Sequence, residues 1–243
     1  MMLDARRARL WDRLGLGPVW TERRAGGDGR GVAEADAPGR GEGTVDRMGW
    51  DQLERAVAGC TACGLCKGRT NTVFGVGSRE SEWMLIGEAP GAEEDLRGEP
   101  FVGQAGRLLD SILTACGLGR AASGPSAVYI ANVVKCRPPS NRNPEPDEAA
   151  RCEPYLRRQI ELLKPRVIVL MGRVAAQAVL GTDASIAALR GRAHRIDAAA
   201  ASVPVIVTYH PAYLLRNLAD KAKVWTDMCL ARDVFDRTEP RPR

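Results

Sequence analysis

Four runs of apolar residues, each the length of one β-strand, recur at wide intervals through the 243-residue sequence. They cover residues 82–88, 127–134, 166–171 and 203–210. A strand that is apolar along its whole length is buried on both faces. Such strands are typical of parallel sheets, because their crossover connections place helices on either side. The sequence therefore predicts an α/β fold, a three-layer α/β/α sandwich with a central four-stranded parallel sheet.

Between these runs, apolar residues recur at helical spacing. One expected helix face carries Ala105, Leu108, Leu109, Ile112, Leu113 and Cys116. A second, after an expected N-cap at Asp147, carries Ala149, Cys152, Leu156, Ile160 and Leu163. In a sheet of this class, ligands bind beyond the carboxyl ends of the strands, so functional residues are expected directly after each apolar run.

The first 45 residues differ in composition from the rest. Leu3, Leu10, Trp11 and Leu14 lie at roughly helical spacing, which predicts a short amphipathic helix, a candidate for binding an unidentified protein partner. Residues 24–44 are rich in glycine and hold one branched aliphatic residue, which is typical of a flexible linker. We therefore expect an N-terminal appendage at 1–45, one globular domain at 46–237 and a disordered tail at 238–243.

The net charge of +5 permits binding to a polyanion but does not indicate it, because many proteins that never meet nucleic acid are equally basic. The longest apolar stretch, residues 167–171, is far shorter than the roughly 20 residues of a membrane span. The N-terminus has acid and arginine where a signal peptide needs an apolar run. We expect a cytoplasmic monomer without membrane contact.

Seven cysteines, an odd number in a chain without an export signal, favour metal ligands or buried thiols over a disulfide framework. Cys60 and Cys63 form a CTAC pair that can chelate one metal centre, and Cys66 competes with it through the overlapping CGLC. Cys136 ends a strand and Cys152 lies sixteen residues further on. A fold that brings these cysteines together would assemble four ligands, for which zinc and an iron–sulfur cluster are nearly equal alternatives.

Cys116 and Cys229 are expected to be small buried hydrophobic residues outside any metal site.

Two strand ends carry unusual residues. GEAPGAEED at 87–95, followed by GEPFVGQAG at 98–106, supplies carboxylates, an aromatic ring and a sharply turning backbone. A strand-to-helix turn shaped only by Gly and Pro would have the same composition, so a polar pocket is one of two interpretations. His210 ends the last apolar run inside YHPAYLLR, and this position favours a functional role over a structural one.

Together these segments resemble the family 4 uracil-DNA glycosylases, the iron–sulfur branch found in bacteria and archaea. The matching text is CTAC at 60, GRT at 68, VFGVG at 73, GEAPGAEED at 87, GEPFVGQAGRLLD at 98, YIANVVKCRPPSNRNPEPDEAARC at 129 and YHPAYLLRN at 209. The resemblance covers about residues 50–236 in order. It implies hydrolysis of the N-glycosidic bond of uracil in single- or double-stranded DNA, the first step of base excision repair. A related branch crosslinks to uracil through a histidine after the KC segment. This chain has none there, so we expect turnover.

The resemblance implies a 4Fe-4S cluster held by Cys60, Cys63, Cys136 and Cys152. It maps the uracil pocket onto Glu88, Ala89, Glu94, Phe101, Asn132 and His210.

In that pocket Phe101 would stack on the base, and the Asn132 carboxamide would accept from uracil N3–H and donate to O4. The second role requires a hydrogen bond that keeps the amide from flipping. His210 would donate to the charge that develops on O2. Glu94 or Glu88 would stabilise the cationic sugar or position water, although Glu94 could instead exclude thymine.

Arg137 and Arg142 are candidates for phosphate contacts, with a solvated loop as the alternative. The tip formed by Tyr213, Leu214, Leu215 and Arg216 fits a DNA wedge that fills the stack left by a flipped base. A loop packed on its own core would look similar.

Two rival interpretations remain. One is a zinc- or iron-bearing hydrolase that uses Glu88, Glu94 and His210 on another substrate. The other is a cluster-containing DNA-binding or electron-transfer protein without glycosylase activity.

Overall fold

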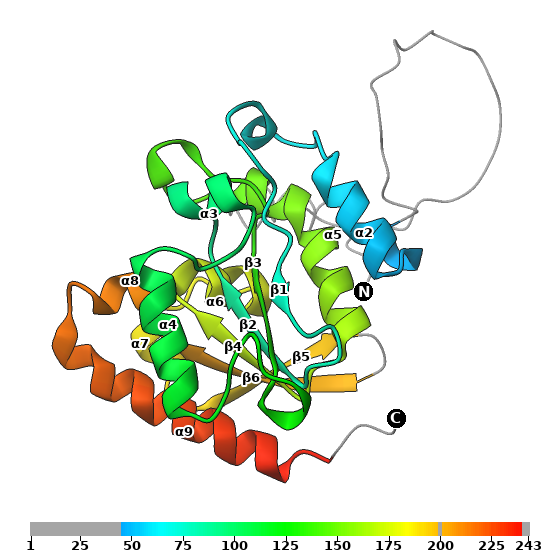
Figure 1. Ribbon diagram of the computed structural model, residues 1–243. Coiled ribbons are helices and arrows are strands. Elements are labelled where there is room, and N and C mark those ends of the chain that lie inside the picture. Colours follow the sequence, from blue (N-terminus) through cyan, green and yellow to red (C-terminus); the bar gives the residue numbers. More distant parts are fainter. Residues whose placement is uncertain (1–44, 199–200, 240–243) are drawn as a thin grey trace, which may run out of the picture. The chain divides into compact units, whose positions relative to one another are not determined.

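A six-stranded sheet lies at the centre of the residues that the computed structural model describes, 45–198 and 201–239 (Figure 1). The strands are β1 Val76–Gly77, β2 Trp83–Gly87, β3 Val128–Asn132, β4 Val167–Met171, β5 Ala193–Ala198 and β6 Ala201–Thr208. Their order is β1-β3-β2-β4-β6-β5. The inner strands β3, β2, β4 and β6 pair in parallel, and β1 and β5 are antiparallel edges.

The four parallel strands coincide with the four apolar runs, so the predicted central sheet is confirmed. The sequence did not indicate the two edge strands. β1 has only two residues, and β5 alternates between exposed and half-buried side chains. An edge strand with one face toward solvent needs no continuous apolar run, and this is why both edges were missed.

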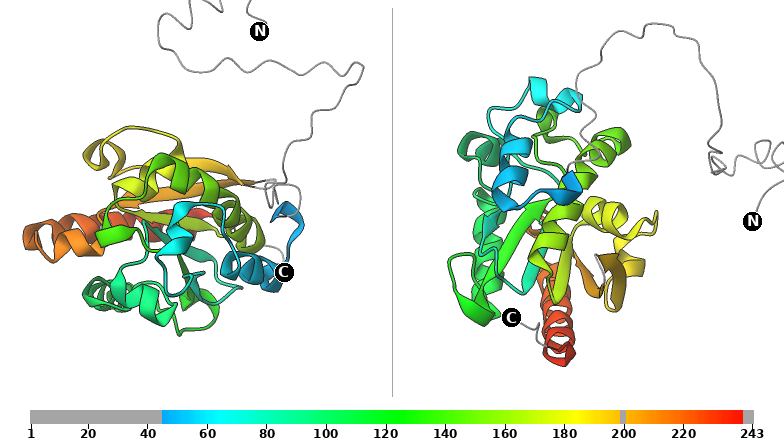
Figure 2. Two further views of the ribbon diagram at one scale, coloured as in Figure 1. Left: turned by 90° about the horizontal axis from the view of Figure 1, so that it is seen from above. Right: turned by 90° about the vertical axis from the view of Figure 1, so that its right-hand side faces the viewer.

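The longer helices are α2 Trp50–Ala58, α4 Gln104–Ala115, α5 Pro146–Leu163, α6 Arg173–Leu180 and α9 Lys221–Arg237. The shorter ones are α3 Ala92–Arg97, α7 Ile186–Leu189 and α8 Pro211–Leu214. Short 3-10 helices occupy Val45–Arg47, Gly64–Lys67, Gly124–Ser126, Pro139–Asn141 and Leu218–Asp220. Figure 2 shows helices on both sides of the sheet, which gives the predicted three layers.

Alternate residues of each strand point to opposite faces of the sheet. Met84 and Ile86 of β2 pack in one core, to which α5 and α6 contribute. Trp83 and Leu85 of the same strand pack in a second core with α4, α8 and α9. The inner strands are therefore buried on both faces, as their continuous apolar runs require.

The expected helices at 105–116 and 149–163 correspond to α4 and α5. The N-cap predicted at Asp147 is wrong, because α5 begins earlier, with Glu145 as its N-cap and Pro146 at the first helical position. The Glu148 carboxylate accepts from the Glu145 backbone N–H at 2.8 Å and closes a capping box. The N-cap residue, the proline at the first helical position and the capping box together start the helix, with the N-cap two residues before Asp147.

The described chain begins at Val45, which packs with Leu53 and Val57 of α2 and with Phe74. All described residues belong to one unit, Gly39–Arg243. The N-terminal helix and linker expected at 1–44, and residues 240–243 of the expected tail, lie outside the described residues. In the described ranges we find no helix with the length and apolar character needed to cross a membrane.

Candidate active site and cysteine cluster

The carboxyl ends of the four parallel strands bring the predicted pocket residues together. Gly87 at the end of β2 pairs with Asn132 at the end of β3. Met171 at the end of β4 pairs with Thr208 of β6, and Gly172 and His210 follow these two strands. Segments far apart in sequence therefore meet at one edge of the sheet, as the parallel topology requires.

Gly87 leaves room for the side chains on either side of it. A Cβ atom at this position would lie 2.5 Å from Asn132 Oδ1 and 2.6 Å from Phe101 Cζ. The Phe101 and His210 ring centroids are 5.4 Å apart, with an angle of 31° between the planes. An amide, an aromatic ring and an imidazole thus form adjoining walls of one site.

Asn132 is 1% exposed, and its Oδ1 is a buried acceptor without a hydrogen-bond partner among the described residues. The hydrogen bond expected to fix its carboxamide is absent from the described part of the chain. Lys135 instead holds the backbone of Asn132, since its Nζ donates to the Asn132 carbonyl at 2.9 Å and to Gln159 Oε1 at 2.6 Å. A buried acceptor without a partner costs about 1–3 kcal/mol, so such a group calls for a ligand that donates to it.

His210 is the N-cap of α8, where its Nδ1 accepts from the Ala212 backbone N–H at 3.1 Å. A neutral imidazole that accepts at Nδ1 carries its proton on Nε2. Burial lowers the pKa of His210 to about 4, against the opposing effect of Glu94. The histidine is therefore a neutral hydrogen-bond donor at physiological pH.

The two candidate carboxylates differ in their surroundings. Glu94 Oε1 accepts from the backbone N–H groups of Val102 at 2.9 Å and Gly103 at 3.0 Å, and Oε2 accepts from Gly91 N–H at 3.1 Å. Glu88 is half-buried; burial raises its pKa, and the nearby Arg173 acts in the opposite direction. Its carboxylate accepts no hydrogen bond within the described ranges. Glu94 is thus bound to the loop that carries Phe101, whereas Glu88 has acceptor capacity left.

Cys60, Cys63, Cys136 and Cys152 line one small cavity between the α2–β1 segment and the β3–α5 segment. Arg69 Nη1 donates to Cys136 Sγ at 3.1 Å, and the Lys135 backbone N–H donates to Cys152 Sγ at 3.3 Å. Burial raises the pKa of the Cys152 thiol to about 11. The fold therefore gathers the four predicted thiols and directs a cation and an amide toward two of them.

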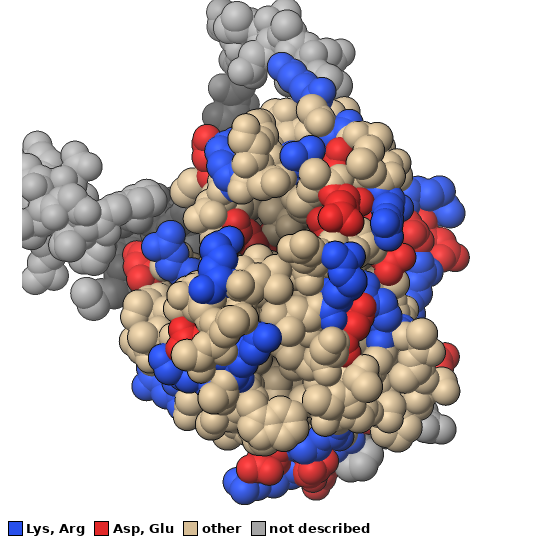
Figure 3. All heavy atoms as spheres, turned by 60° about the vertical axis from the view of Figure 1, so that its left-hand side comes forward, with Lys and Arg blue, Asp and Glu red and all other residues tan. Residues whose placement is uncertain are grey.

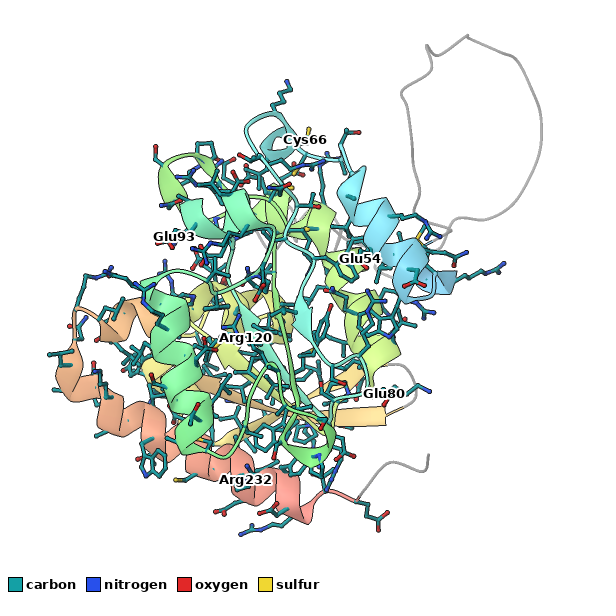
Figure 4. The ribbon with its side chains drawn as sticks, in the orientation of Figure 1. Glu54, Cys66, Glu80, Glu93, Arg120 and Arg232 are labelled. Atoms are coloured by element: carbon teal, nitrogen blue, oxygen red, sulfur yellow. The ribbon has the colours of Figure 1, made fainter. Side chains whose placement is uncertain are left out.

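The other three cysteines differ from one another. Cys66 lines the same cavity as the four predicted ligands, at the outer end of the molecule where Figure 4 labels it. Cys116 is half-buried against the core that α4 and α9 share, broadly as expected. Cys229 is exposed on α9, so the expectation that it is buried is wrong. No group of three or more His, Cys, Asp and Glu side chains in the described ranges is arranged to hold a single metal ion.

Residues 74–229 match the model of the uracil DNA glycosylase superfamily. The chain belongs to this family. The type-4 uracil-DNA glycosylase of Archaeoglobus fulgidus is 44% identical over 169 residues, which cover 68% of this chain and 82% of the relative. That of Thermotoga maritima is 45% identical over 172 residues, covering 70% and 85%. That of Pyrobaculum aerophilum is 40% identical over 187 residues, covering 75% and 93%.

In this member of the family, the segment after His210 forms the short helix α8 rather than a free loop. Leu214 is fully buried in the core, so the prediction of an exposed Leu214 at a wedge tip is wrong. Tyr213 stacks on Tyr209 with centroids 4.8 Å apart, and its hydroxyl donates to Asp220 at 2.6 Å. Leu215, 41% exposed, is the apolar side chain of the predicted tip that reaches the surface.

The two arginines predicted to contact phosphates have different hydrogen-bond partners. Arg142 donates to both carboxylate oxygens of Glu148, at 2.8 and 2.7 Å. Within the described ranges, Arg137 donates to the neutral Asn141 side chain at 2.7 Å and forms no ion pair with a carboxylate. On the face turned forward in Figure 3, basic and acidic side chains alternate around an uncharged surface. Positive charge on this face is therefore divided among separate side chains and does not form a continuous basic strip.

Sequence reasoning missed several residues of the glycosylase site. Gly87 was noted only as a turn residue, although its missing side chain opens the site. Lys135 lies in the matched KCRPP segment, but its 1% exposure follows from packing that no sequence pattern shows. Arg69 lies in the matched GRT segment, but no sequence pattern placed it beside the cysteines. Arg120 beside Phe101 belongs to an ordinary-looking segment, where a surface arginine would be expected.

Proposed function

We propose that the protein removes uracil from DNA by hydrolysing the bond between the base and the deoxyribose, and so initiates base excision repair. The observation that carries this proposal is the unpartnered, buried Asn132 Oδ1, enclosed by Gly87 and Phe101. Uracil presents an N–H donor at N3 between two carbonyl acceptors. A buried acceptor beside an aromatic ring fits that edge.

Asn132 then selects the base. With Oδ1 facing N3–H, its Nδ2 donates to O4, and cytosine presents the opposite pattern with an acceptor at N3 and an amino group at C4. A side chain at position 87 would occupy the space beside this carboxamide, since a Cβ there would lie 2.5 Å from Asn132 Oδ1. Phe101 contributes stacking, which any base can share, so recognition of uracil depends on the amide.

His210 supports departure of the base. As the glycosidic bond breaks, negative charge accumulates on uracil O2, and a preorganised donor placed there stabilises the transition state more than the ground state. The proton on His210 Nε2 supplies this donor, and the Ala212 N–H at Nδ1 fixes the ring. Because the imidazole is neutral, its hydrogen bond strengthens as charge develops.

We assign the two carboxylates separate roles. Glu88, with free acceptor capacity, would orient the attacking water or face the cationic sugar. Glu94 acts on the loop that carries Phe101, through its bonds to Val102 and Gly103. Ala89 follows Glu88 in the chain and packs against the core to which α5 and α6 contribute, and we assign its backbone to the base pocket.

A 4Fe-4S cluster fits the four thiols of Cys60, Cys63, Cys136 and Cys152, because thiolates gathered in a buried cavity need positive charge and N–H···S hydrogen bonds. When bound, the cluster would supply a covalent crosslink between the N-terminal cysteine pair and the β3–α5 segment. None of the bond-breaking steps above requires it. Cys66 remains outside this ligand set.

DNA must deliver the base in an extrahelical conformation, at a cost of a few kcal/mol. We propose that Leu215 and Arg216 approach the vacated stack and that Arg137 contacts a phosphate, whereas Arg142 shapes the loop through Glu148. We further propose that the protein acts on uracil-containing DNA as a monomer in the bacterial cytoplasm.

The proposal is tested with purified protein of full length on a labelled oligonucleotide that contains a single uracil. We expect brown protein that leaves an alkali-labile site at uracil, in single strands and in U·G and U·A pairs, and leaves thymine and cytosine controls intact. Asn132→Asp should relax the preference for uracil over cytosine. Brown, folded protein that binds DNA but never excises uracil would instead support a DNA-binding or electron-transfer role.

A further inference from the structure

Phe101 is held in a backbone conformation that it would not adopt freely. Phe101 lies in the loop between α3 and α4. Its φ is +57°, in the left-handed region that disfavours residues with a side chain. The ring is 6% exposed and faces both His210 and the Gly87 position. Such a conformation persists only where the surroundings fix it.

One arginine binds the carbonyl side of this loop. Arg120 Nη1 donates to the Pro100 carbonyl at 2.9 Å, and Nη2 donates to the Phe101 carbonyl at 3.0 Å. Its side chain is only 16% exposed, and ion pairs with Glu99 and Asp110 orient the guanidinium. Figure 4 shows Arg120 beside α4, the helix that follows the loop.

The opposite side of the loop is bound through its N–H groups. Glu94 accepts from Val102 and Gly103, the two residues after Phe101. Gly106 of α4 lets the Phe101 carbonyl approach closely, because a Cβ at position 106 would lie 1.8 Å from that oxygen. Arg120 and Glu94 thus hold consecutive peptide groups from two sides.

We propose that Arg120 is a positioning residue for uracil binding: it fixes the left-handed Phe101 backbone so that the ring is already placed to stack on the extrahelical base. This inference rests on the proposed role of Phe101 in the uracil site. Arg120 also pairs with the Glu99 carboxylate, but it reaches Pro100 and Phe101 through their main-chain carbonyls and not through the Phe101 ring. Its effect should therefore depend entirely on the aromatic side chain that those carbonyls orient.

The proposal predicts a selective loss of base affinity. Stacking of one base on an aromatic ring corresponds to about 5-fold to about 150-fold in affinity. Phe101→Ala should therefore raise the inhibition constant of free uracil within that range. Arg120→Gln should raise it by at least about 5-fold but by no more than Phe101→Ala does, with a smaller change in the single-turnover rate at saturating DNA. Arg120→Lys, which keeps one cationic donor, should recover part of the loss.

The decisive measurement is a double-mutant cycle on the inhibition constant of free uracil, in proteins that retain their brown colour and cooperative unfolding. If Arg120 acts through Phe101, Arg120→Gln should add nothing once Phe101 is alanine. Arg79→Gln is the matched control, since Arg79 also pairs with two carboxylates, Asp51 and Glu54, but donates to no carbonyl of this loop. It should leave the inhibition constant unchanged.

The outcomes test the stacking role of Phe101 and the positioning role of Arg120 separately. If Phe101→Ala leaves uracil inhibition unchanged, the proposed stacking role itself fails. If Phe101→Ala weakens inhibition but Arg120→Gln does not, or if the two losses multiply in the double variant, Arg120 is not the positioning residue. If Arg79→Gln weakens inhibition by free uracil as much as Arg120→Gln does, the effect of Arg120→Gln is general destabilisation and the proposal fails.

Discussion

Replacing His210 tests the chemistry most directly, because the structure assigns its two ring nitrogens different tasks. Nδ1 caps α8 by accepting from Ala212 N–H, and Nε2 carries the proton that we place against uracil O2. His210→Asn keeps an N-cap acceptor but is too short to donate at the same point. His210→Ala removes both functions, so the pair separates catalysis from helix capping.

The expected loss of excision rate follows from removal of the His210 Nε2 donor alone. Removing one preorganised donor to a developing oxyanion costs about 10²–10³ in rate, and we expect both variants to lose at least this much in single-turnover excision. His210→Asn should keep its affinity for uracil-containing DNA, its brown colour and a thermal transition near that of the unmodified protein. His210→Ala should unfold at a lower temperature, since it also loses the cap.

The sign of the pH dependence distinguishes a neutral donor from a cationic one. With the pKa lowered to about 4, only about one His210 in a thousand is protonated at pH 7. Excision should therefore be insensitive to this group from pH 6 to 8 and should decline only as the pH approaches 4. The unfolded histidine takes up its proton first, near pH 6.5, so the contribution of His210 to stability should also fall between about pH 6.5 and 4.

The rate should be measured under single-turnover conditions, with excess enzyme on a uracil-containing single strand, so that product release does not limit it. Activity that climbs as the pH drops below 6.5, and that His210→Asn abolishes, would show a cationic imidazole and refute the neutral-donor reasoning. Turnover of His210→Asn within about threefold of the unmodified protein would remove His210 from the mechanism altogether.

Three further results are expected. Gly87→Ala should block excision because its Cβ would enter the pocket, whereas Gly64→Ala, which meets open space, should be active in the same assay. Cys136→Ala should lose the visible absorbance and lower the melting temperature, and Cys229→Ala should do neither; retained colour would exclude Cys136 as a ligand. Deleting residues 1–44 should spare excision, since every residue that we assign to the site lies after Val45 in the sequence, and an inactive truncation would place the N-terminal segment in the enzyme.

Much of the fold and the site's location could be predicted from local pattern. An inner strand of a parallel sheet must be apolar on both faces, so the segments around Leu85, Ile130, Val169 and Ile206 were visible as continuous runs. Since parallel strands end at one edge, the sequence also determined that the residues after them would meet. The cysteine spacing predicted a gathering of thiols in which Cys66 competed for the first pair, and motif resemblance was needed to choose the four ligands and to name the metal group and the base.

The tertiary structure decided what depends on contacts between distant segments. The same stretch after β6 contains a buried Leu214 and an exposed Leu215, because α8 turns one side chain into the core and leaves the next outside. The division between Glu88 and Glu94 follows from which carboxylate meets backbone N–H groups. The neutral state of His210 follows from its burial, and the hold of Arg120 on Phe101 joins residues that only the packed chain brings together. Local sequence sets periodicity and chemical type, whereas desolvation and hydrogen-bond partners arise only when the layers pack.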